Sequence, residues 1–128
     1  MEYRFHHFHL VCRDLDKTIS FFTDTLGGKF IEFRKFGNTD GAVIDLPGTS
    51  IYLRLAREEE IETGGQSPAV YGYHHLGLEV EDLEACHSAL TSGGFTFITP
   101  PTVTPRGKIA FFQGPDEIII ELVQQIKL

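Results

Sequence analysis

The interpretation of this chain depends on residues 73–82, Tyr73-His74-His75-Leu76-Gly77-Leu78-Glu79-Val80-Glu81-Asp82, because a related stretch stands near the N-terminus. The earlier copy is Phe5-His6-His7-Phe8-His9-Leu10-Val11-Cys12-Arg13-Asp14. In both copies a pair of histidines precedes a short apolar run, and an aspartate follows the second histidine by seven residues. Each copy leads into a helical pattern that ends at a Gly-Gly pair. The two copies therefore indicate a duplicated structural unit.

Apolar alternation with period two predicts strands, and apolar residues spaced by three and four predict helices. The first unit is expected to contain a strand over 5–12, a helix from Asp14 to Gly27-Gly28, and strands over 29–34, 42–46 and 50–57. The second is expected to contain a strand over 74–80, a helix from Asp82 to Gly93-Gly94, and strands over 95–98, 108–113 and 117–124. Pro100-Pro101 is expected to end the strand before it, because proline cannot donate to a ladder. The order strand, helix, three strands thus occurs twice.

The length of 128 residues fits one α+β domain made of two small modules. We place module 1 at 1–58, a polar linker at 59–70 and module 2 at 71–128. A helix should cover one face of each sheet, leaving the other face to curve around a cavity. The residues assigned to that second face include several polar side chains: His7, His9, Tyr52, Arg54, His75 and Glu121.

Composition excludes some classes of function. The net charge of −7 argues against nucleic-acid binding, which needs clustered positive charge. No apolar run approaches the ~20 residues of a membrane span, and the N-terminus does not resemble a signal peptide. Cys12 and Cys86 both stand within apolar patterns, which favours buried thiols over a disulfide or a metal site. We expect a soluble protein of the cytoplasm, with a small molecule as its partner.

The repeated arrangement resembles the vicinal oxygen chelate superfamily, which includes glyoxalase I, methylmalonyl-CoA epimerase, type I extradiol dioxygenases, fosfomycin-resistance enzymes and bleomycin-binding proteins. The resemblance rests on the spacings from His7 to Asp14 and from His75 to Asp82, and on the closing stretch 114–122, Gly-Pro-Asp-Glu-Ile-Ile-Ile-Glu-Leu. That stretch is similar to an Asp-Pro-Asp-Gly…Ile-Glu-Leu pattern, from which Gly114 and Glu117 depart. The resemblance implies a curved mixed sheet around a metal-binding cavity.

The same resemblance implies that His7, His75 and Glu121 bind a divalent metal ion, which could be Zn, Ni, Fe or Mn. A fourth ligand is expected in an Ile-Glu-Leu step of the first module, but Ile51-Tyr52-Leu53 stands there. Two histidines and one carboxylate leave coordination positions open for a substrate. Without a metal, an arginine partner for Glu121 and a cavity-wall role for the histidines are the alternatives.

Within this scheme Glu121 and Tyr52 are the catalytic candidates, and His9, Arg54 and Arg106 are the substrate-binding candidates. Pocket-lining or solvated side chains are the alternative for those three residues and for Tyr52. The resemblance implies a metal-dependent lyase or isomerase of the glyoxalase I type acting on a small oxygen-chelating substrate, and an assembly as a homodimer. A ring-cleaving dioxygenase, a fosfomycin-type thiol transferase and a non-catalytic bleomycin-like binding protein stay open.

Overall fold

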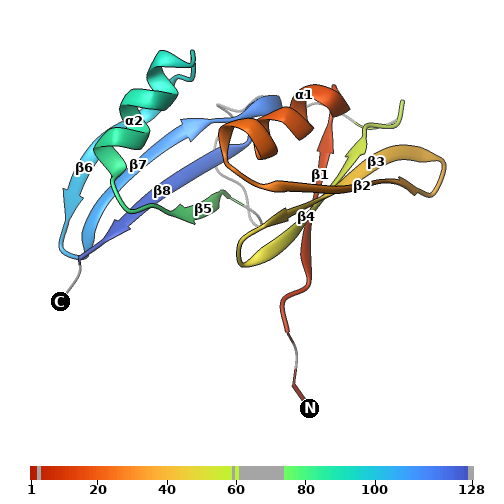
Figure 1. Cartoon of the computed structure of the whole chain (residues 1–128), viewed down its shortest axis with the longest axis horizontal. Coiled ribbons are helices and arrows are strands. Elements are labelled where there is room, and N and C mark those ends of the chain that lie inside the picture. Colours follow the sequence, from red (N-terminus) through yellow and green to blue (C-terminus); the bar gives the residue numbers. More distant parts are fainter. Residues whose placement is uncertain (3, 59, 61–73, 127–128) are drawn as a thin grey trace. The chain divides into compact units, whose positions relative to one another are not determined.

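The chain consists of two units of the same design, Met1–Glu62 and Thr63–Leu128, seen in a computed structural model (Figure 1). The structure describes residues 1–2, 4–58, 60 and 74–126. The predicted linker therefore lies outside the described residues, apart from Glu60. Within each unit the order strand, helix, three strands is confirmed.

The elements of unit 1 are strand β1 (His7–Cys12), helix α1 (Leu15–Ser20), a π-helical continuation η1 (Phe21–Thr25), and strands β2 (Lys29–Phe36), β3 (Thr39–Leu46) and β4 (Thr49–Leu55). The elements of unit 2 are β5 (Leu76–Glu79), α2 (Leu83–Ser92), β6 (Phe97–Thr104), β7 (Gly107–Gln113), the 3₁₀ turn η2 (Pro115–Glu117) and β8 (Ile119–Gln125).

The two sheets have equivalent topology. Their strand orders are β1-β4-β3-β2 and β5-β8-β7-β6. In each sheet the first strand of the unit runs parallel to the last, and the remaining pairs are antiparallel. The first and last strands of a unit are thereby neighbours, although more than thirty residues separate them in the sequence. This pairing brings the second histidine of each repeated stretch and the last strand of its unit to the same part of the sheet.

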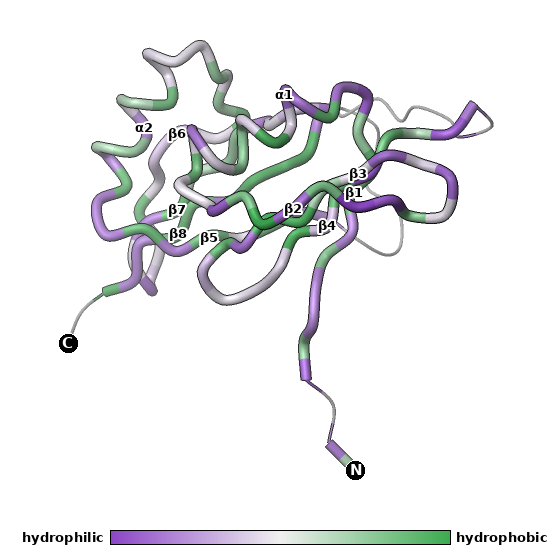
Figure 2. Tube along the Cα trace, turned by 45° about the vertical axis from the view of Figure 1, so that its right-hand side comes forward, coloured by the Kyte–Doolittle hydropathy of each residue, from purple (hydrophilic) through white to green (hydrophobic). Residues whose placement is uncertain are grey.

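A hydrophobic core lies between each helix and its sheet. Helix α1 contacts β3 and β4, and α2 contacts β6, β7 and β8. In Figure 2 hydrophobic and hydrophilic residues alternate along α2, as expected for a helix with one buried side. The buried apolar residues of unit 1 are Cys12, Phe21, Phe22, Ala42, Val43, Ile44, Leu46, Ile51 and Leu53, and those of unit 2 are Leu76, Leu83, Leu90, Ala110, Phe112, Ile120 and Leu122.

Both helices begin at the aspartates of the repeated pattern. The Lys17 amide donates to Oδ1 of Asp14 over 3.0 Å, and the Ala85 amide donates to Oδ1 of Asp82 over 3.1 Å. Each carboxylate thus satisfies an amide that has no partner within the helix, which explains why the sequence spacing located both helix starts.

The end of α2 depends on a glycine in a left-handed conformation. Gly94 has φ of 93° and no heavy atom within 4 Å of the place a Cβ would take, whereas the preceding Gly93 has φ of −79°. We expect Gly94→Ala to lower the free energy of unfolding by about 1–2 kcal/mol through backbone strain alone. Chemical denaturation should show Gly93→Ala changing it by less than about 0.5 kcal/mol; equal losses in both variants would contradict this explanation.

The predicted strand break at Pro100-Pro101 is wrong. Strand β6 continues through both prolines, from Phe97 to Thr104. It is an edge strand, and its pairing with β7 shifts register between Phe97 and Thr99 and again between Thr99 and Thr102. At an edge with such irregularities, the amide that proline lacks is not needed for the ladder.

The turn before β8 explains one departure from the family pattern. Asp116 has φ of 55° and Glu117 has φ of 62°, both in the left-handed region. The family pattern has glycine where Glu117 stands, and glycine adopts this conformation without steric cost. Glu117 therefore adopts the left-handed conformation that favours the glycine of the family pattern.

Candidate metal and substrate site

The strongest candidate site is the contact between His75 and Glu121 in unit 2. Nε2 of His75 donates a hydrogen bond to Oε1 of Glu121 over 3.0 Å. His75 stands two residues before Gly77, which pairs with Glu121 across the parallel strands β5 and β8. Both side chains are half-buried, with exposed fractions of 31% and 19%. Residues 46 positions apart thus place an imidazole nitrogen and a carboxylate oxygen at one point of the sheet.

The register of the two sheets shows which residues correspond in the two units. Gly77 pairs with Glu121 in unit 2, and His9 pairs with Tyr52 in unit 1. Tyr52 therefore occupies in its sheet the place that Glu121 occupies in the other. This register supports the sequence alignment in which tyrosine replaces the first carboxylate. It also shows that His9 stands where unit 2 has a glycine, so the area beside Glu121 is the more open one.

His7 has an aromatic environment in unit 1. Its ring stacks on Tyr52 with centroids 4.0 Å apart and planes inclined by 13°. The Arg34 guanidinium lies 5.1 Å from the centroid of the Tyr52 ring, a cation–π distance. Nδ1 of His7 lies 2.9 Å from Nδ1 of His6, just as Nδ1 of His75 lies 2.8 Å from Nδ1 of His74. The paired histidines thus have the same local arrangement in both copies.

His9 lies in positive surroundings. Its ring packs against Phe36 with centroids 4.6 Å apart. Burial lowers the pKa of His9 below its usual value, and the charges of Arg54, His7 and Arg57 lower it further. A neutral imidazole is therefore favoured at this position.

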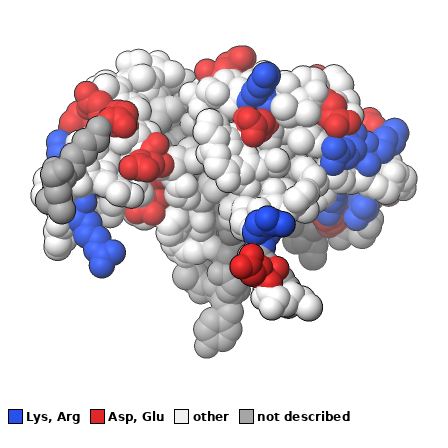
Figure 3. Space-filling model, turned by 60° about the horizontal axis from the view of Figure 1, so that its bottom comes forward, with Lys and Arg blue, Asp and Glu red and all other residues white. Residues whose placement is uncertain are grey.

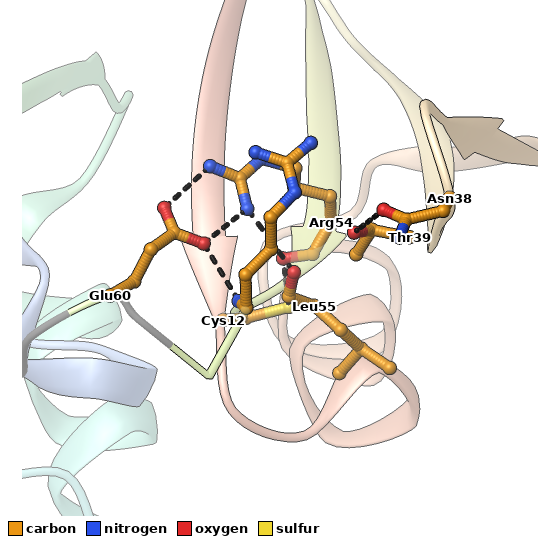
Figure 4. A network of polar contacts seen from close by, with 7 residues as sticks. Cys12, Asn38, Thr39, Arg54, Leu55 and Glu60 are labelled. Carbon is orange, nitrogen blue, oxygen red and sulfur yellow. Dashed lines mark hydrogen bonds and ion pairs between the residues drawn. The ribbon is translucent and has the colours of Figure 1, made fainter.

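Arg54 is held by an ion pair that the sequence did not suggest. Its Nη1 and Nη2 atoms donate to Oε1 and Oε2 of Glu60, each over 2.6 Å (Figure 4). The Arg57 amide donates to the same carboxylate over 2.7 Å. Glu60 lay in the range interpreted as a solvated linker, so sequence reasoning missed it. Arg54 is thus not a solvated arginine, and its role toward a substrate stays a prediction.

The Glu60 carboxylate should make stability depend on pH. Hydrogen bonds from Arg54 and then from the Arg57 amide lower its pKa from 4.5 to about 2. A lowered folded-state pKa gives stability that is present above 4.5 and is lost as pH falls toward 2. Thermal unfolding should therefore show a difference between the native chain and Glu60→Gln that shrinks over this interval. A difference independent of pH would contradict the ion-pair explanation.

Arg106 lies beside the same hollow as Glu121. This hollow of about 730 Å³ is lined by Thr104, Pro105, Arg106, Lys108, Ile109, Glu121, Val123, Gln124, Gln125 and Ile126. Its volume is within the range of small-molecule pockets, and its lining combines apolar side chains with two cations. The Arg106 side chain could therefore reach a substrate bound at Glu121.

The donor atoms at His75 and Glu121 fit a divalent metal ion. Imidazole nitrogen and carboxylate oxygen are usual ligands of Zn, Fe, Mn and Ni, and here they already converge at 3.0 Å. Within residues 1–2, 4–58, 60 and 74–126, no group of three or more His, Cys, Asp or Glu side chains is arranged to hold an ion. His7 belongs to the other unit, so its part in the ligand set stays a prediction.

Two aromatic neighbours were also missed by sequence reasoning. The Phe111 ring packs edge-on against His75 with centroids 5.2 Å apart, and Phe36 lies beside Tyr52 at 5.4 Å. Phe111 pairs directly with Glu121 in the sheet. The position of Phe111 beside Glu121 follows from period-two alternation only when the register of β7 and β8 is known. The sequence alone does not give that register.

Charged side chains of both signs lie near one another. On the face shown in Figure 3, acidic side chains lie beside basic ones rather than apart from them. The ion pairs at exposed or half-exposed positions include Glu32–Arg34, Asp40–Lys35 and Glu84–Lys108. Among the described residues, no helix has the length and apolar character needed to cross a bilayer.

Neither Cys12 nor Cys86 forms a disulfide. Cys12 is buried, as predicted, whereas Cys86 is only half-buried. Burial and the charge of Asp82 raise the pKa of the Cys86 thiol. Neither cysteine is part of the candidate site.

A family model for the Glyoxalase/Bleomycin resistance protein/Dioxygenase superfamily matches residues 4–122. The chain belongs to this superfamily. The duplicated βαβββ units and the paired registers of the two sheets are thereby explained as the superfamily fold. The resemblance seen in the sequence and the predicted fold class are both confirmed.

Individual members of the superfamily show the range of similarity. Lactoylglutathione lyase from Schizosaccharomyces pombe is 26% identical over 144 residues, covering 96% of this chain and 48% of the relative. The chain thus spans about half the length of that curated relative. A glyoxylase/bleomycin resistance protein/dioxygenase domain from Frankia sp. EAN1pec is 27% identical, with a TM-score of 0.75 and coverage of 94% and 95%.

A more distant structure shares the fold only. A variant of the fosfomycin resistance protein FosX from Listeria monocytogenes, in complex with Mn(II) and 1S,2S-dihydroxypropylphosphonic acid, is 16% identical. Its TM-score is 0.77, and the match covers 98% of this chain and 95% of that one. That protein of the same fold was thus crystallised with a divalent metal ion and a small organic molecule.

Proposed function

We propose that this chain is a divalent-metal-dependent lyase or isomerase of the glyoxalase I type, acting on a small substrate with neighbouring oxygen atoms. The contact between Nε2 of His75 and Oε1 of Glu121 supports this proposal most directly. His75, Glu121 and His7 are the proposed ligands. The similarity to lactoylglutathione lyase favours this reaction class over others in the superfamily.

A bound divalent ion would supply Lewis acidity to the substrate oxygens. The Glu121 carboxylate accepts a proton from the substrate and returns it to a neighbouring atom, as general acid–base catalysis requires. Its position supports this role because Gly77, the paired residue on β5, leaves the adjacent space open. A Cβ built on Gly77 would still lie 3.7 Å from Oε1 of Glu121.

The other site candidates are assigned to the substrate. Arg106 lines the hollow that contains Glu121, and its guanidinium suits an anionic group of the substrate. Tyr52 takes the place of a second carboxylate, and its hydroxyl can donate a hydrogen bond where a carboxylate could only accept one. His9, in its neutral form, provides a polar edge beside Tyr52, at a centroid distance of 6.0 Å.

Metal binding by purified protein tests the proposal. Isothermal titration with Mn(II), Zn(II) and Ni(II) should give one site per chain, and His75→Ala should weaken binding by at least about 10–100-fold, since changes even outside the ligand shell cost this much. Binding should also weaken at acidic pH, because the ion must displace the proton between Nε2 and Oε1.

His87→Ala is the matched control for this experiment. His87 is a half-buried histidine of the same unit whose ring packs against Phe97 at 4.5 Å, away from Glu121. It should leave metal affinity unchanged. Unaltered metal binding in His75→Ala, with a native circular dichroism spectrum, would overturn the proposed site.

One observation favours a second candidate. Tyr52 at the position equivalent to Glu121 leaves two histidines and one carboxylate, a set typical of non-haem Fe(II) oxygenases. A ring-cleaving dioxygenase should bind a catechol in the presence of Fe(II) under anaerobic conditions, with a change in the optical spectrum. No optical change in that titration, together with turnover of a hemithioacetal with Ni(II) or Zn(II), supports the lyase.

We also propose that the chain acts in the cytoplasm and assembles as a homodimer.

A further inference from the structure

The Glu60 carboxylate occupies a receptor with three donors. Two come from the Arg54 guanidinium, at 2.6 Å each, and the third is the Arg57 amide at 2.7 Å (Figure 4). The two parallel bonds from one guanidinium form the planar fork that matches a carboxylate. Glu60 therefore shows which chemical group this place recognises.

The residue that carries the guanidinium donors is part of a strand, whereas the Arg57 amide follows the end of β4 at Leu55. Arg54 pairs with Val11 on one side and with Gly41 on the other, in the middle of the sheet. Its carbonyl accepts a hydrogen bond from Sγ of Cys12 over 3.4 Å, and its Nη1 also donates to the Leu55 carbonyl over 3.3 Å. Arg54 is thus anchored on β4, whereas the Arg57 amide and Glu60 belong to the segment that follows the strand.

The surroundings suit an organic acid. Arg34 pairs with Gly41 from the opposite side, so Arg34 and Arg54 flank a residue without a side chain. The Phe36 ring covers that glycine, since a Cβ built on Gly41 would lie 2.6 Å from Phe36 Cδ2. Arg54 is 14% exposed, so a carboxylate bound to its guanidinium is partly shielded from water, which strengthens the contact.

The receptor also lies on the site face of unit 1. Arg54 stands two residues after Tyr52 on β4, so the two side chains project from the same face roughly 7 Å apart. Tyr52 is the counterpart of Glu121 in the sheet register. A carboxylate bound at Arg54 would thus lie next to the aromatic cluster of His9, Phe36 and Tyr52.

We propose that Arg54 and the Arg57 amide form a binding site for the carboxylate of a small organic acid, and that Glu60 fills this site when the acid is absent. Carboxylate binding at Arg54 requires no metal, so this proposal can be tested independently of the proposed reaction. Glu60 competes as a tethered ligand, at an effective concentration on the order of millimolar. A monocarboxylate should therefore bind weakly to the native chain and more tightly once Glu60 is removed.

Acetate titration of metal-free protein, followed by the Arg57 amide signal in ¹⁵N–¹H NMR spectra, tests this site directly. In Glu60→Ala the signal should shift with saturation at a dissociation constant of about 1–10 mM, the range of weak small-molecule binding. The native chain should need up to about twofold more acetate, because Glu60 competes at an effective concentration on the order of millimolar. Sodium chloride at equal ionic strength, which cannot form a two-pronged contact, should not reproduce the saturating shift.

The double variant Arg54→Met with Glu60→Ala is the matched control, and it should not respond. A shift in Glu60→Ala that does not saturate, or that persists without Arg54, would overturn the proposal and leave Glu60 as a structural tether only. Dispersed signals from the core residues of unit 1 report that each variant is folded. If Glu60→Ala does not fold, Glu60→Gln takes its place, because it retains the size of the side chain. The same saturating shift with acetate is then expected.

A substrate carboxylate and a separate acid are distinguished by kinetics. If the bound group belongs to the substrate, Arg54→Met should raise KM in the assay of the proposed reaction while kcat changes little, and acetate should inhibit competitively. If the acid is a separate ligand, acetate should act without competing with substrate. Metal affinity should be unchanged in Arg54→Met under either outcome. A negative result for carboxylate binding can therefore be distinguished from a negative result for metal binding.

Discussion

Replacing Phe112 by alanine should destabilise the chain by about 3–5 kcal/mol, the usual cost of removing a buried aromatic side chain. Phe112 is fully buried in the core of unit 2, and its ring contacts Phe95 and Phe97 at centroid distances of 5.7 and 5.2 Å. Its neighbours belong to a regular sheet and a loop and cannot collapse fully into the space. Since domains are stable by only about 5–15 kcal/mol, the loss is a large fraction of the total.

Urea unfolding followed by circular dichroism measures this effect. Phe22→Ala repeats the experiment in unit 1, where Phe22 is equally buried and contacts Phe21 at 5.1 Å. Phe33→Ala is the control, because this phenylalanine is 65% exposed on β2 and should cost less than about 0.5 kcal/mol. Comparable losses at Phe33 and Phe112 would show that the assigned core is wrong.

Glu121→Gln should reduce kcat of the proposed reaction by about 10²–10⁴-fold, the contribution typical of general acid–base catalysis. The substitution keeps the shape of the side chain and an oxygen that can contact His75, but it removes the group that holds the proton. We therefore expect metal binding to weaken less than in His75→Ala, while turnover is lost. Turnover of a hemithioacetal at saturating metal is the measurement.

Glu84→Gln provides the matched change of charge in the same unit. Glu84 lies on α2, its side chain is 59% exposed, and it pairs with Lys108 at 3.6 Å. Its effect on kcat should stay within about twofold, since exposed ion pairs contribute little. If Glu121→Gln retained the native rate at saturating metal, the carboxylate would be a ligand at most, and the proton would have to be carried by another group.

The repeated pattern allowed much of the fold to be predicted. The spacing from histidine to aspartate located the first strand and the helix start in both units, because an aspartate cap and a period-two strand are local features. The resemblance placed Tyr52 where the family pattern has an acid, and Tyr52 is the counterpart of Glu121 in the sheet register, while its role stays a prediction. The course of strand β6 through Pro100-Pro101 was not predicted. Whether a proline interrupts a strand depends on whether its missing amide would point to a neighbouring strand or to solvent, and the sequence does not show which strand lies at the edge.

The site itself was predicted only in part. His75 and Glu121 were assigned to one face, but their contact at 3.0 Å depends on the parallel pairing of β5 and β8. Glu60 was interpreted as part of a solvated linker, because nothing in a polar tract indicates that a carboxylate reaches an arginine six residues earlier. Arg106 was chosen because an arginine can hold an anionic group, and only the structure places it beside the hollow that Glu121 lines.

The sequence by itself determined the duplicated βαβββ plan, the helix boundaries and the inward rows of the strands, since these follow from short-range periodicity and capping. Tertiary structure alone decided which polar residues meet. Strands that are distant in the sequence become neighbours through backbone pairing, and a shift of one residue in that register would turn Glu121 away from His75 to the other face of the sheet.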